Sequence, residues 1–241
     1  MASPSVIAFV FARGGSKGLS RKNLRVLGGH PLVAHSIRAA QASGIVERVM
    51  VSTEDAEIAE VAEEYGADVP WLRPPELASD AAPELLAWQH ALAHLDTRGV
   101  DFDVFLSLPP TAPLRTPTHV VEAVQLFERK PCDLVITGSP ARRNPTFNMV
   151  VIDSHGFVEV AMPNVESPTR RQGAPPMYDM STVAYVADPD YLRKAKRLLS
   201  GRVRLLEVAP EHAIDIDTEL DLEIAEALWQ RMPSVGTRRV P

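Results

Sequence analysis

The chain is expected to fold as an α/β sandwich around a mainly parallel sheet. Short apolar runs rich in β-branched residues alternate with longer stretches of helical periodicity, which is the pattern of successive β-α-β units. The chain has 241 residues, of which 45% are hydrophobic and 23% are charged, so it can bury one substantial core. We therefore expect a single domain over residues 1–232 and a flexible tail over residues 233–241.

The first half of the chain alternates strands and helices regularly. The expected strands are residues 6–11, 48–52 and 104–108, and the expected helices are residues 31–43, 55–65 and 83–95. The strand segments are short and apolar, whereas apolar residues recur every three or four positions in the helical segments. Thr53 or Asp55 can cap the second helix.

The second half continues this alternation around one interruption. The expected helices are residues 118–129, 189–199 and 219–231, and the expected strands are residues 134–137, 182–187 and 203–208. Residues 139–177 are rich in Pro, Arg and Asn around a hairpin-like pair, residues 147–152 and 157–161. Because such a composition suits an exposed segment better than a central sheet, we expect an inserted arm at 139–177.

The charge, the amino-terminal sequence and the cysteine count together exclude several classes of function. A formal net charge of -6 provides no general attraction to nucleic acids or anionic membranes. The amino-terminal sequence lacks the features of a signal peptide, and no apolar run approaches the roughly 20 residues that span a bilayer. We therefore expect a cytoplasmic protein. Cys132 is the only cysteine, so an internal disulfide and a thiolate metal cluster are excluded.

A basic glycine loop follows the first expected strand. Its sequence is Ala12-Arg13-Gly14-Gly15-Ser16-Lys17-Gly18, and Arg21-Lys22-Asn23 comes shortly after it. Glycines allow successive backbone N–H groups to turn toward one point and bind phosphate oxygens, while Arg13, Lys17 and Lys22 add charge that can neutralise a triphosphate. A turn with solvated basic side chains is the alternative. The spacing is neither that of a Walker A loop nor that of a dinucleotide-binding turn.

An acid pair, Asp215 and Asp217, precedes the last expected helix. Alternate residues of an extended segment point the same way, so both carboxylates can face one site. Such hard oxygen ligands suit Mg²⁺, which bridges carboxylates to substrate phosphates. In the alternative interpretation, Asp217 only caps the final helix through its side chain, a role that Thr218 could share.

A proline loop, Leu108-Pro109-Pro110-Thr111-Ala112-Pro113-Leu114-Arg115, follows the third expected strand. By itself it is a rigid entry into a helix. In open parallel α/β sheets, however, ligands bind beyond the carboxyl ends of the strands, where this loop and the glycine loop would both lie. Residues 73–80, which could contact a base edge, and residues 169–172, whose arginines could bind an anion, are weaker candidates, because exposed surface segments explain them nearly as well. The seven histidines show no ligand spacing.

Six segments of the chain, taken together, resemble the acylneuraminate (CMP-sialic acid) cytidylyltransferases. In chain order they are VIAFVFARGGSKGLSRKN, VSTEDAEIAEVAEEYGA, LRPPELASD, LPPTAPLR, TRRQGAPPMY and IDIDTELDLEIAEAL. The resemblance extends from about residue 6 to residue 229. Six blocks in the same order are far more specific than any one of them.

The resemblance implies a CTP-dependent cytidylyltransferase on a Rossmann-like three-layer sandwich of the nucleotide-diphospho-sugar transferase type. It also implies Mg²⁺ or Mn²⁺ on Asp215 and Asp217, and a homodimer whose arm reaches the partner's site. The predicted catalytic residues are Arg13, Lys17, Lys22 and Asp217. The predicted nucleotide-binding residues are Ala12, Arg13, Gly14, Gly15, Ser16, Lys17, Arg21, Lys22, Asn23, Arg73, Asp80, Pro110 and Thr111. The predicted acceptor-binding residues are Pro109, Thr111, Arg170, Arg171, Gln172, Tyr178 and Ser181.

Departures from the family pattern fall on the acceptor side. Pro109 stands where the family usually has a glutamine that contacts the sugar acid, and Ala112 replaces a serine. Tyr178 is followed by Asp-Met-Ser, where the family has Asn-Gly-Ala or a close variant. We therefore expect CMP transfer to an acidic acceptor that differs from N-acetylneuraminate, with a sialic, legionaminic or pseudaminic type of nonulosonic acid as first choice.

Three alternatives remain open at this point. A phosphonate acceptor is the closest, because the missing glutamine argues against a standard sugar contact. A non-catalytic nucleotide-binding protein is another, although such a protein has no need of both the basic loop and the acid pair. The third is an enzyme that prefers UTP or dTTP. The group that takes the acceptor proton and the number of metal ions are not readable from the sequence.

Overall fold

The computed structural model describes residues 4–79, 82–129, 131–163, 173 and 175–232. Its centre is a six-stranded sheet with the strand order β10-β6-β9-β5-β1-β4. The strands are β1 (Val6–Phe11), β4 (Arg48–Ser52), β5 (Val104–Ser107), β6 (Leu134–Pro140), β9 (Tyr178–Ala187) and β10 (Val203–Glu207). All neighbouring strands run parallel except that β9 is antiparallel to β5 and β6, which confirms the predicted mainly parallel sheet.

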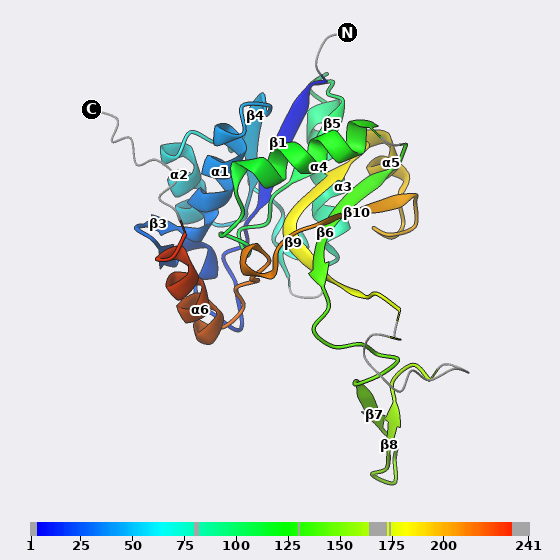
Figure 1. Ribbon diagram of the computed structural model, residues 1–241. Helices are drawn as coiled ribbons and strands as arrows, with labels where there is room; N and C mark the ends of the chain where they lie inside the picture. Colours follow the sequence, from blue (N-terminus) through cyan, green and yellow to red (C-terminus); the bar gives the residue numbers. More distant parts are fainter. Residues whose placement is uncertain (1–3, 80–81, 130, 164–172, 174, 233–241) are drawn as a thin grey trace.

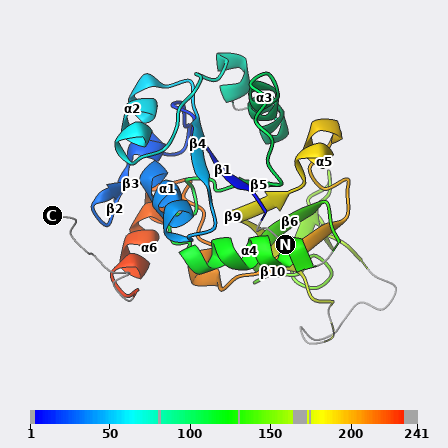
Figure 2. The ribbon, with the colours of Figure 1, turned by 90° about the horizontal axis from the view of Figure 1, so that it is seen from above.

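Helices cover both faces of the sheet (Figures 1 and 2). Alternate residues of β1 enter opposite cores, because successive side chains of a strand point to opposite faces: Ala8 and Val10 enter one core, and Ile7 and Phe9 the other. The helices of the first core are α1 (Leu32–Ala42), α2 (Ala56–Glu64) and α4 (Pro117–Arg129), and those of the second are α3 (Glu84–Asp96) and α5 (Pro189–Lys194). The result is the predicted three-layer sandwich.

The last helix, α6 (Glu219–Trp229), forms a smaller core with residues near the start of the chain. Leu222 and Ala225 pack there with Leu27 and Leu32. The short elements of this region and of the loops are β2 (Val26–Leu27), β3 (His30–Pro31), η1 (Lys22–Leu24), η2 (Pro75–Ala78) and η4 (Pro210–His212). Packing of α6 therefore holds the acid pair, which precedes this helix, close to the glycine loop, which follows β1.

A hairpin of β7 (Val150–Ile152) and β8 (Val158–Val160) extends away from the sandwich (Figure 1). It lies within the predicted arm, and the hairpin strands are shorter than the predicted ones. Parts of that arm and the predicted tail at 233–241 lie outside the described residues. Among the residues that the structure describes, no helix combines the length and the apolar character needed to cross a membrane.

The predicted boundaries of α5, β6 and β9 are wrong, and tertiary contacts explain all three. The helix predicted at 189–199 ends at Lys194, where the side-chain amide of Gln89 donates to the carbonyls of Leu192 and Ala195, each at 2.9 Å. β6 and β9 extend beyond the predicted strands because their main chains keep pairing as far as Pro140 and Tyr178. Such contacts between distant segments have no local sequence pattern.

Candidate active site

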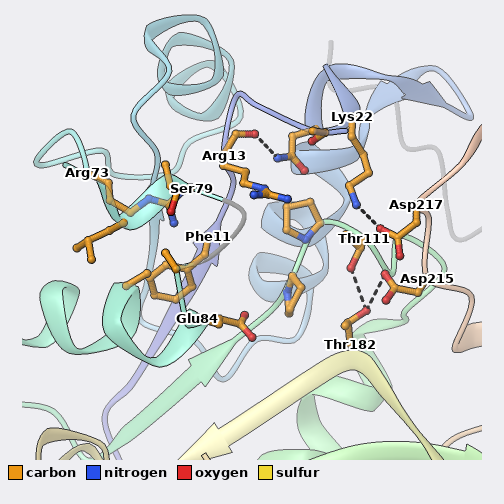
Figure 3. Close-up of a pocket in the computed structure, with 18 residues that line it drawn as sticks. Phe11, Arg13, Lys22, Arg73, Ser79, Glu84, Thr111, Thr182, Asp215 and Asp217 are labelled. Atoms are coloured by element: carbon orange, nitrogen blue, oxygen red, sulfur yellow. Dashed lines mark hydrogen bonds and ion pairs between the residues drawn. The ribbon is translucent and has the colours of Figure 1, made fainter. Parts of the chain in front are cut away.

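A pocket of about 330 Å³ opens beside the ends of β1 and β5 (Figure 3). Its lining comes from segments that are far apart in the sequence: the glycine loop, the segment around η2, the start of α3, the proline loop, β9 and the acid pair. The predicted site residues in this lining are Arg13, Ser16, Lys22, Asn23, Arg73, Pro109, Pro110, Thr111, Asp215 and Asp217. The structure therefore brings together the basic and acidic segments that the sequence singles out.

The glycine loop and the acid pair are in direct contact. The ammonium group of Lys22 donates to Oδ1 of Asp217 at 2.7 Å, although the two residues are 195 positions apart. Gly18 permits this approach, because a Cβ at that position would lie 2.4 Å from the carbonyl oxygen of Asp217. The side-chain amide of Asn23 donates to the carbonyl of Arg13 at 2.8 Å and so ties the start of the loop to η1.

Buried contacts on both sides orient the acid pair toward the pocket. Ile216, which is fully buried, anchors the segment in the small core, and its N–H donates to the carbonyl of Thr111 at 2.8 Å. Asp215 and Asp217 therefore point the other way, into the pocket. The interpretation of Asp217 as a helix cap is wrong, because Thr218 caps α6 in a reciprocal pair of hydrogen bonds with Asp221.

The acid pair fits a cation that takes only part of its ligands from protein. Within the described part of the chain, no group of three or more His, Cys, Asp or Glu residues could hold a metal ion. Two exposed carboxylates beside a basic loop match Mg²⁺, which keeps several waters and is completed by substrate phosphates. Neutral oxygens are also near, since Thr182 donates to Asp215 at 3.4 Å and Thr111 and Thr182 share a hydrogen bond of 3.0 Å.

Arg115 holds the proline loop against β9. Its buried guanidinium group donates to the carbonyls of Val183 at 2.7 Å and Thr182 at 3.0 Å, and also to the carbonyl of Pro109 and the hydroxyl of Ser36. Burial lowers the pKa of Arg115 to about 9, so it stays charged at neutral pH. A single side chain therefore sets the position of the pocket wall formed by the proline loop.

Arg73 links the glycine loop to the opposite wall of the pocket. It is 5% exposed, and it donates to Oε2 of Glu54 at 3.1 Å, while Oε1 of Glu54 accepts from the N–H of Gly14 at 2.7 Å. The Nε of Arg73 is buried without a hydrogen-bond partner among the described residues. The bond to Glu54 also means that one of the glycine-loop amides already has a protein acceptor.

Several predicted site residues lie outside the pocket lining. Arg21 has a left-handed backbone with φ of 53° and forms ion pairs with Asp55 at 2.9 Å and with Glu57. Ser181 is buried and donates to Oγ1 of Thr137 at 3.0 Å, while Tyr178 is exposed. Ala12, Gly14, Gly15 and Lys17 belong to the glycine loop but do not border the cavity itself. Asp80, Arg170, Arg171 and Gln172 lie outside the described residues.

The pocket also contains residues that the sequence interpretation missed. Thr182 faces the pocket in place of Ser181, because neighbouring residues of a strand face opposite ways and β9 is irregular opposite Ile136 and Thr137. Phe11, the last residue of β1, and Glu84, the first residue of α3, also line the pocket. Strand alternation could have suggested Thr182, whereas no local pattern distinguishes Glu84 from an ordinary residue in the first turn of a helix.

Comparisons with known proteins identify the family of the chain. A family model described as Cytidylyltransferase matches residues 7–232. The chain is 35% identical over 224 residues to CMP-N,N'-diacetyllegionaminic acid synthase of Campylobacter jejuni, a match that covers 92% of this chain and 94% of the relative. The protein of the same name from Legionella pneumophila is 34% identical over 232 residues, with 93% and 96% covered.

Solved structures add an independent comparison of the fold. CMP:2-keto-3-deoxy-manno-octonic acid synthetase, solved in complex with CTP, superposes with a TM-score of 0.70 and covers 94% of this chain and 99% of its own. At 18% identity, this similarity shows the fold alone. Together with the family match over nearly the whole chain, it confirms the predicted fold class. The chain belongs to the cytidylyltransferase family.

Proposed function

We propose that the protein transfers CMP from CTP to a nonulosonic acid and releases pyrophosphate. The observation that carries the proposal is the pairing of Lys22 with Asp217 across one pocket, which joins a cationic loop to an acid pair at the distance of a single hydrogen bond. Two relatives that cover nearly all of the chain are named CMP-N,N'-diacetyllegionaminic acid synthases. Their names indicate the class of acceptor.

In this proposal, the nucleotide lies across the pocket. Arg13 and Lys22, which line the cavity, hold the β- and γ-phosphates, Lys17 of the glycine loop adds positive charge beside them, and Arg73 lies next to cytidine. An acceptor oxygen attacks the α-phosphorus, and pyrophosphate leaves as the bond to the β-phosphate oxygen breaks. Because the charged groups are already in position, they stabilise the negative charge that develops on the phosphate oxygens without a side-chain nucleophile.

Asp215 and Asp217 are the residues that would hold a divalent cation, Mg²⁺ or Mn²⁺. When bound there, the cation neutralises phosphate charge. The contact between Lys22 and Asp217 means that the ammonium group competes with a cation for one ligand oxygen. Lys22 can then turn toward the phosphates once the acid pair has another positive partner.

The acceptor lies against the wall that the proline loop and β9 form. Pro109 offers no polar side chain there, and Thr111 and Thr182 supply hydroxyl groups. This wall differs from the predicted family pattern at Pro109, which favours a nonulosonic acid other than N-acetylneuraminate. The side chains predicted to grip the acceptor carboxylate, Arg170 and Arg171, lie outside the described residues.

Pyrophosphate release with a panel of acceptors tests this function. The purified protein is incubated with CTP, Mg²⁺ and either legionaminic, sialic or pseudaminic acids or simple alkyl phosphonates, and the product is identified by mass spectrometry. We expect CMP conjugation to at least one nonulosonic acid, with kcat/KM more than about 100-fold above that for any phosphonate or for UTP or dTTP. Omission of the metal should abolish turnover. Preference for a phosphonate, or no release with any acid, would contradict the proposal.

We further propose that the protein is a homodimer that acts in the cytoplasm, where CTP is available. The β7–β8 hairpin exposes a row of apolar side chains: Val150, Val151, Ile152, Phe157 and Val158 are each more than half exposed. An isolated hairpin of two strands is marginally stable in water, and an exposed apolar surface of this kind is typical of an interface. A second copy of the chain would cover it.

Light scattering after size-exclusion chromatography tests the dimer. The double variant Ile152→Asp/Phe157→Asp should elute with the mass of a monomer, because charged groups on the hairpin would be buried in the interface. Leu220→Asp is the matched control, since Leu220 is 63% exposed, against 71% for both Ile152 and Phe157, but lies on α6. A wild-type protein that is monomeric, or a double variant that remains dimeric, would overturn this assignment.

A further inference from the structure

Glu84 places a third carboxylate in the pocket, opposite the acid pair. It is the first residue of α3, and Figure 3 shows its carboxylate directed into the cavity, with Asp215 and Asp217 entering from the other side. Among the described lining residues, the carboxylates are the only groups able to accept a proton near neutral pH, because no histidine or cysteine borders the cavity. Asp217 is already paired with Lys22.

The surroundings of Glu84 differ from those of a solvated carboxylate. Glu84 as a residue is exposed, because the cavity is open, but protein atoms crowd its carboxylate, and the resulting desolvation raises the pKa of Glu84 to about 7. Asp215 raises the pKa further, whereas Trp88 and Arg73 favour the ionised form. Burial raises the pKa of the Tyr185 phenol of β9, and the charge of Glu84 raises this pKa further. Desolvation of this kind keeps a carboxylate basic enough to take a proton.

Trp88 is placed to orient the carboxylate. It lies four residues after Glu84, on the same face of α3. Trp88 is fully buried, and its indole nitrogen has no hydrogen-bond partner among the described residues. An unsatisfied buried donor is costly, so a small rotation that lets it donate to Glu84 is favourable once that carboxylate is ionised.

We propose that Glu84 is the general base that accepts the proton of the acceptor hydroxyl during attack on the α-phosphorus. This assignment rests on the proposed function. The acceptor O–H bond breaks as its proton passes to a carboxylate oxygen of Glu84, and the freed electron pair of the acceptor oxygen forms the new bond to phosphorus. The bond between the α-phosphorus and its bridging oxygen breaks, and its electron pair leaves with pyrophosphate. Glu84 then loses the proton to solvent.

Ionisation of Glu84 destabilises the folded protein, so the melting temperature gives a readout that is independent of turnover. Its pKa in the folded protein, about 7, lies above the unfolded reference of 4.5, so the protonated form is the one that folding favours. That stabilisation is present below pH 4.5 and is lost as the pH rises through 7. The melting temperature of the wild type should therefore fall relative to that of Glu84→Gln between about pH 5 and about pH 8.

The pH dependence of kcat for the wild type, Glu84→Gln and Glu84→Asp tests the assignment. At saturating CTP and acceptor, wild-type kcat should rise through a pH near 7, because the base acts when it is deprotonated. Glu84→Gln should lose about 100-fold in kcat together with this acid limb, while its Kd for CTP in calorimetry stays within about twofold. Glu84→Asp should keep the limb at a reduced rate. Glu76→Gln, an exposed carboxylate of η2 outside the cavity, is the matched control.

Other outcomes separate this inference from the function on which it rests. If the wild type turns over and Glu84→Gln retains both its kcat and its acid limb, Glu84 is not the base although the proposed function stands. If Glu84→Gln weakens CTP binding and leaves kcat unchanged, Glu84 binds the nucleotide and the assignment is wrong. If the wild type releases no pyrophosphate with any acceptor, the proposed function fails and the assignment fails with it.

Discussion

Replacement of Asp217 by asparagine is expected to lower kcat/KM by more than about 1000-fold without measurable loss of the fold. The change removes a negative charge and a hard oxygen ligand from the acid pair and leaves the shape of the side chain nearly intact. Asp217 does not cap α6, because Thr218 and Asp221 form that cap, and its side chain is 69% exposed. Its loss should therefore affect turnover and leave the melting temperature nearly unchanged.

The matched control for this variant is Glu211→Gln. Glu211 is an exposed carboxylate of η4, close in sequence to the acid pair but outside the cavity lining. Initial rates of pyrophosphate release across a series of Mg²⁺ concentrations should show wild-type behaviour for the control and no recovery for Asp217→Asn at any concentration. An Asp217→Asn enzyme with more than about a tenth of wild-type kcat/KM would show that this carboxylate is not needed for phosphoryl transfer.

Replacement of Lys22 by methionine should reduce kcat/KM by about 1000-fold. Lys22 carries positive charge into the cavity from η1, and only 13% of its side chain is exposed, so water cannot replace the lost charge effectively. Methionine keeps a long unbranched side chain and removes the ammonium group. Since the partner Asp217 is largely exposed, the lost ion pair should cost little stability.

The loss of activity in Lys22→Met should come more from a lower kcat than from weaker binding of CTP. Lys22→Met is expected to weaken CTP binding, measured by calorimetry, less than it lowers kcat, because charge on the phosphate oxygens is greatest in the transition state. The same substitution at Lys194, on α5 and outside the cavity lining, serves as the control and should leave both quantities at their wild-type values. If Lys22→Met has a normal kcat and only a raised KM, Lys22 binds the nucleotide equally well in the ground state and in the transition state, and the prediction is wrong.

The fold and the two charged clusters were predictable because their signals are local. The alternation of residues in β1 and the apolar periodicity of α1 and α2 follow directly from strand and helix geometry. The basic glycine loop and the acid pair are recognisable because their residue types match phosphate and Mg²⁺ chemistry. Their meeting was expected from the resemblance and not from a local pattern, because the packing of α6 against residues near the start of the chain brings the acid pair to the glycine loop.

The features that the sequence did not predict depend on distant contacts. Arg115 looked like a loop residue, yet it is buried and ties Pro109 to β9. Glu54 belongs to a segment that resembles the family, but nothing in that segment assigned it a role, although it joins Gly14 to Arg73. The pKa of Glu84 is set by the walls around it, which only the folded chain assembles. Such properties arise from burial in three dimensions, which local sequence patterns do not contain.

The structure of the protein in complex with CTP and Mg²⁺ is the most direct test of the central claim, that one triphosphate joins the glycine loop to the acid pair. The account predicts phosphate oxygens within hydrogen-bonding distance of Lys22 and a cation on Asp215 and Asp217, with cytidine beside Arg73. Two results would contradict it. One is a triphosphate bound elsewhere, and the other is a triphosphate whose phosphates lie far from an acid pair that is still bonded to Lys22.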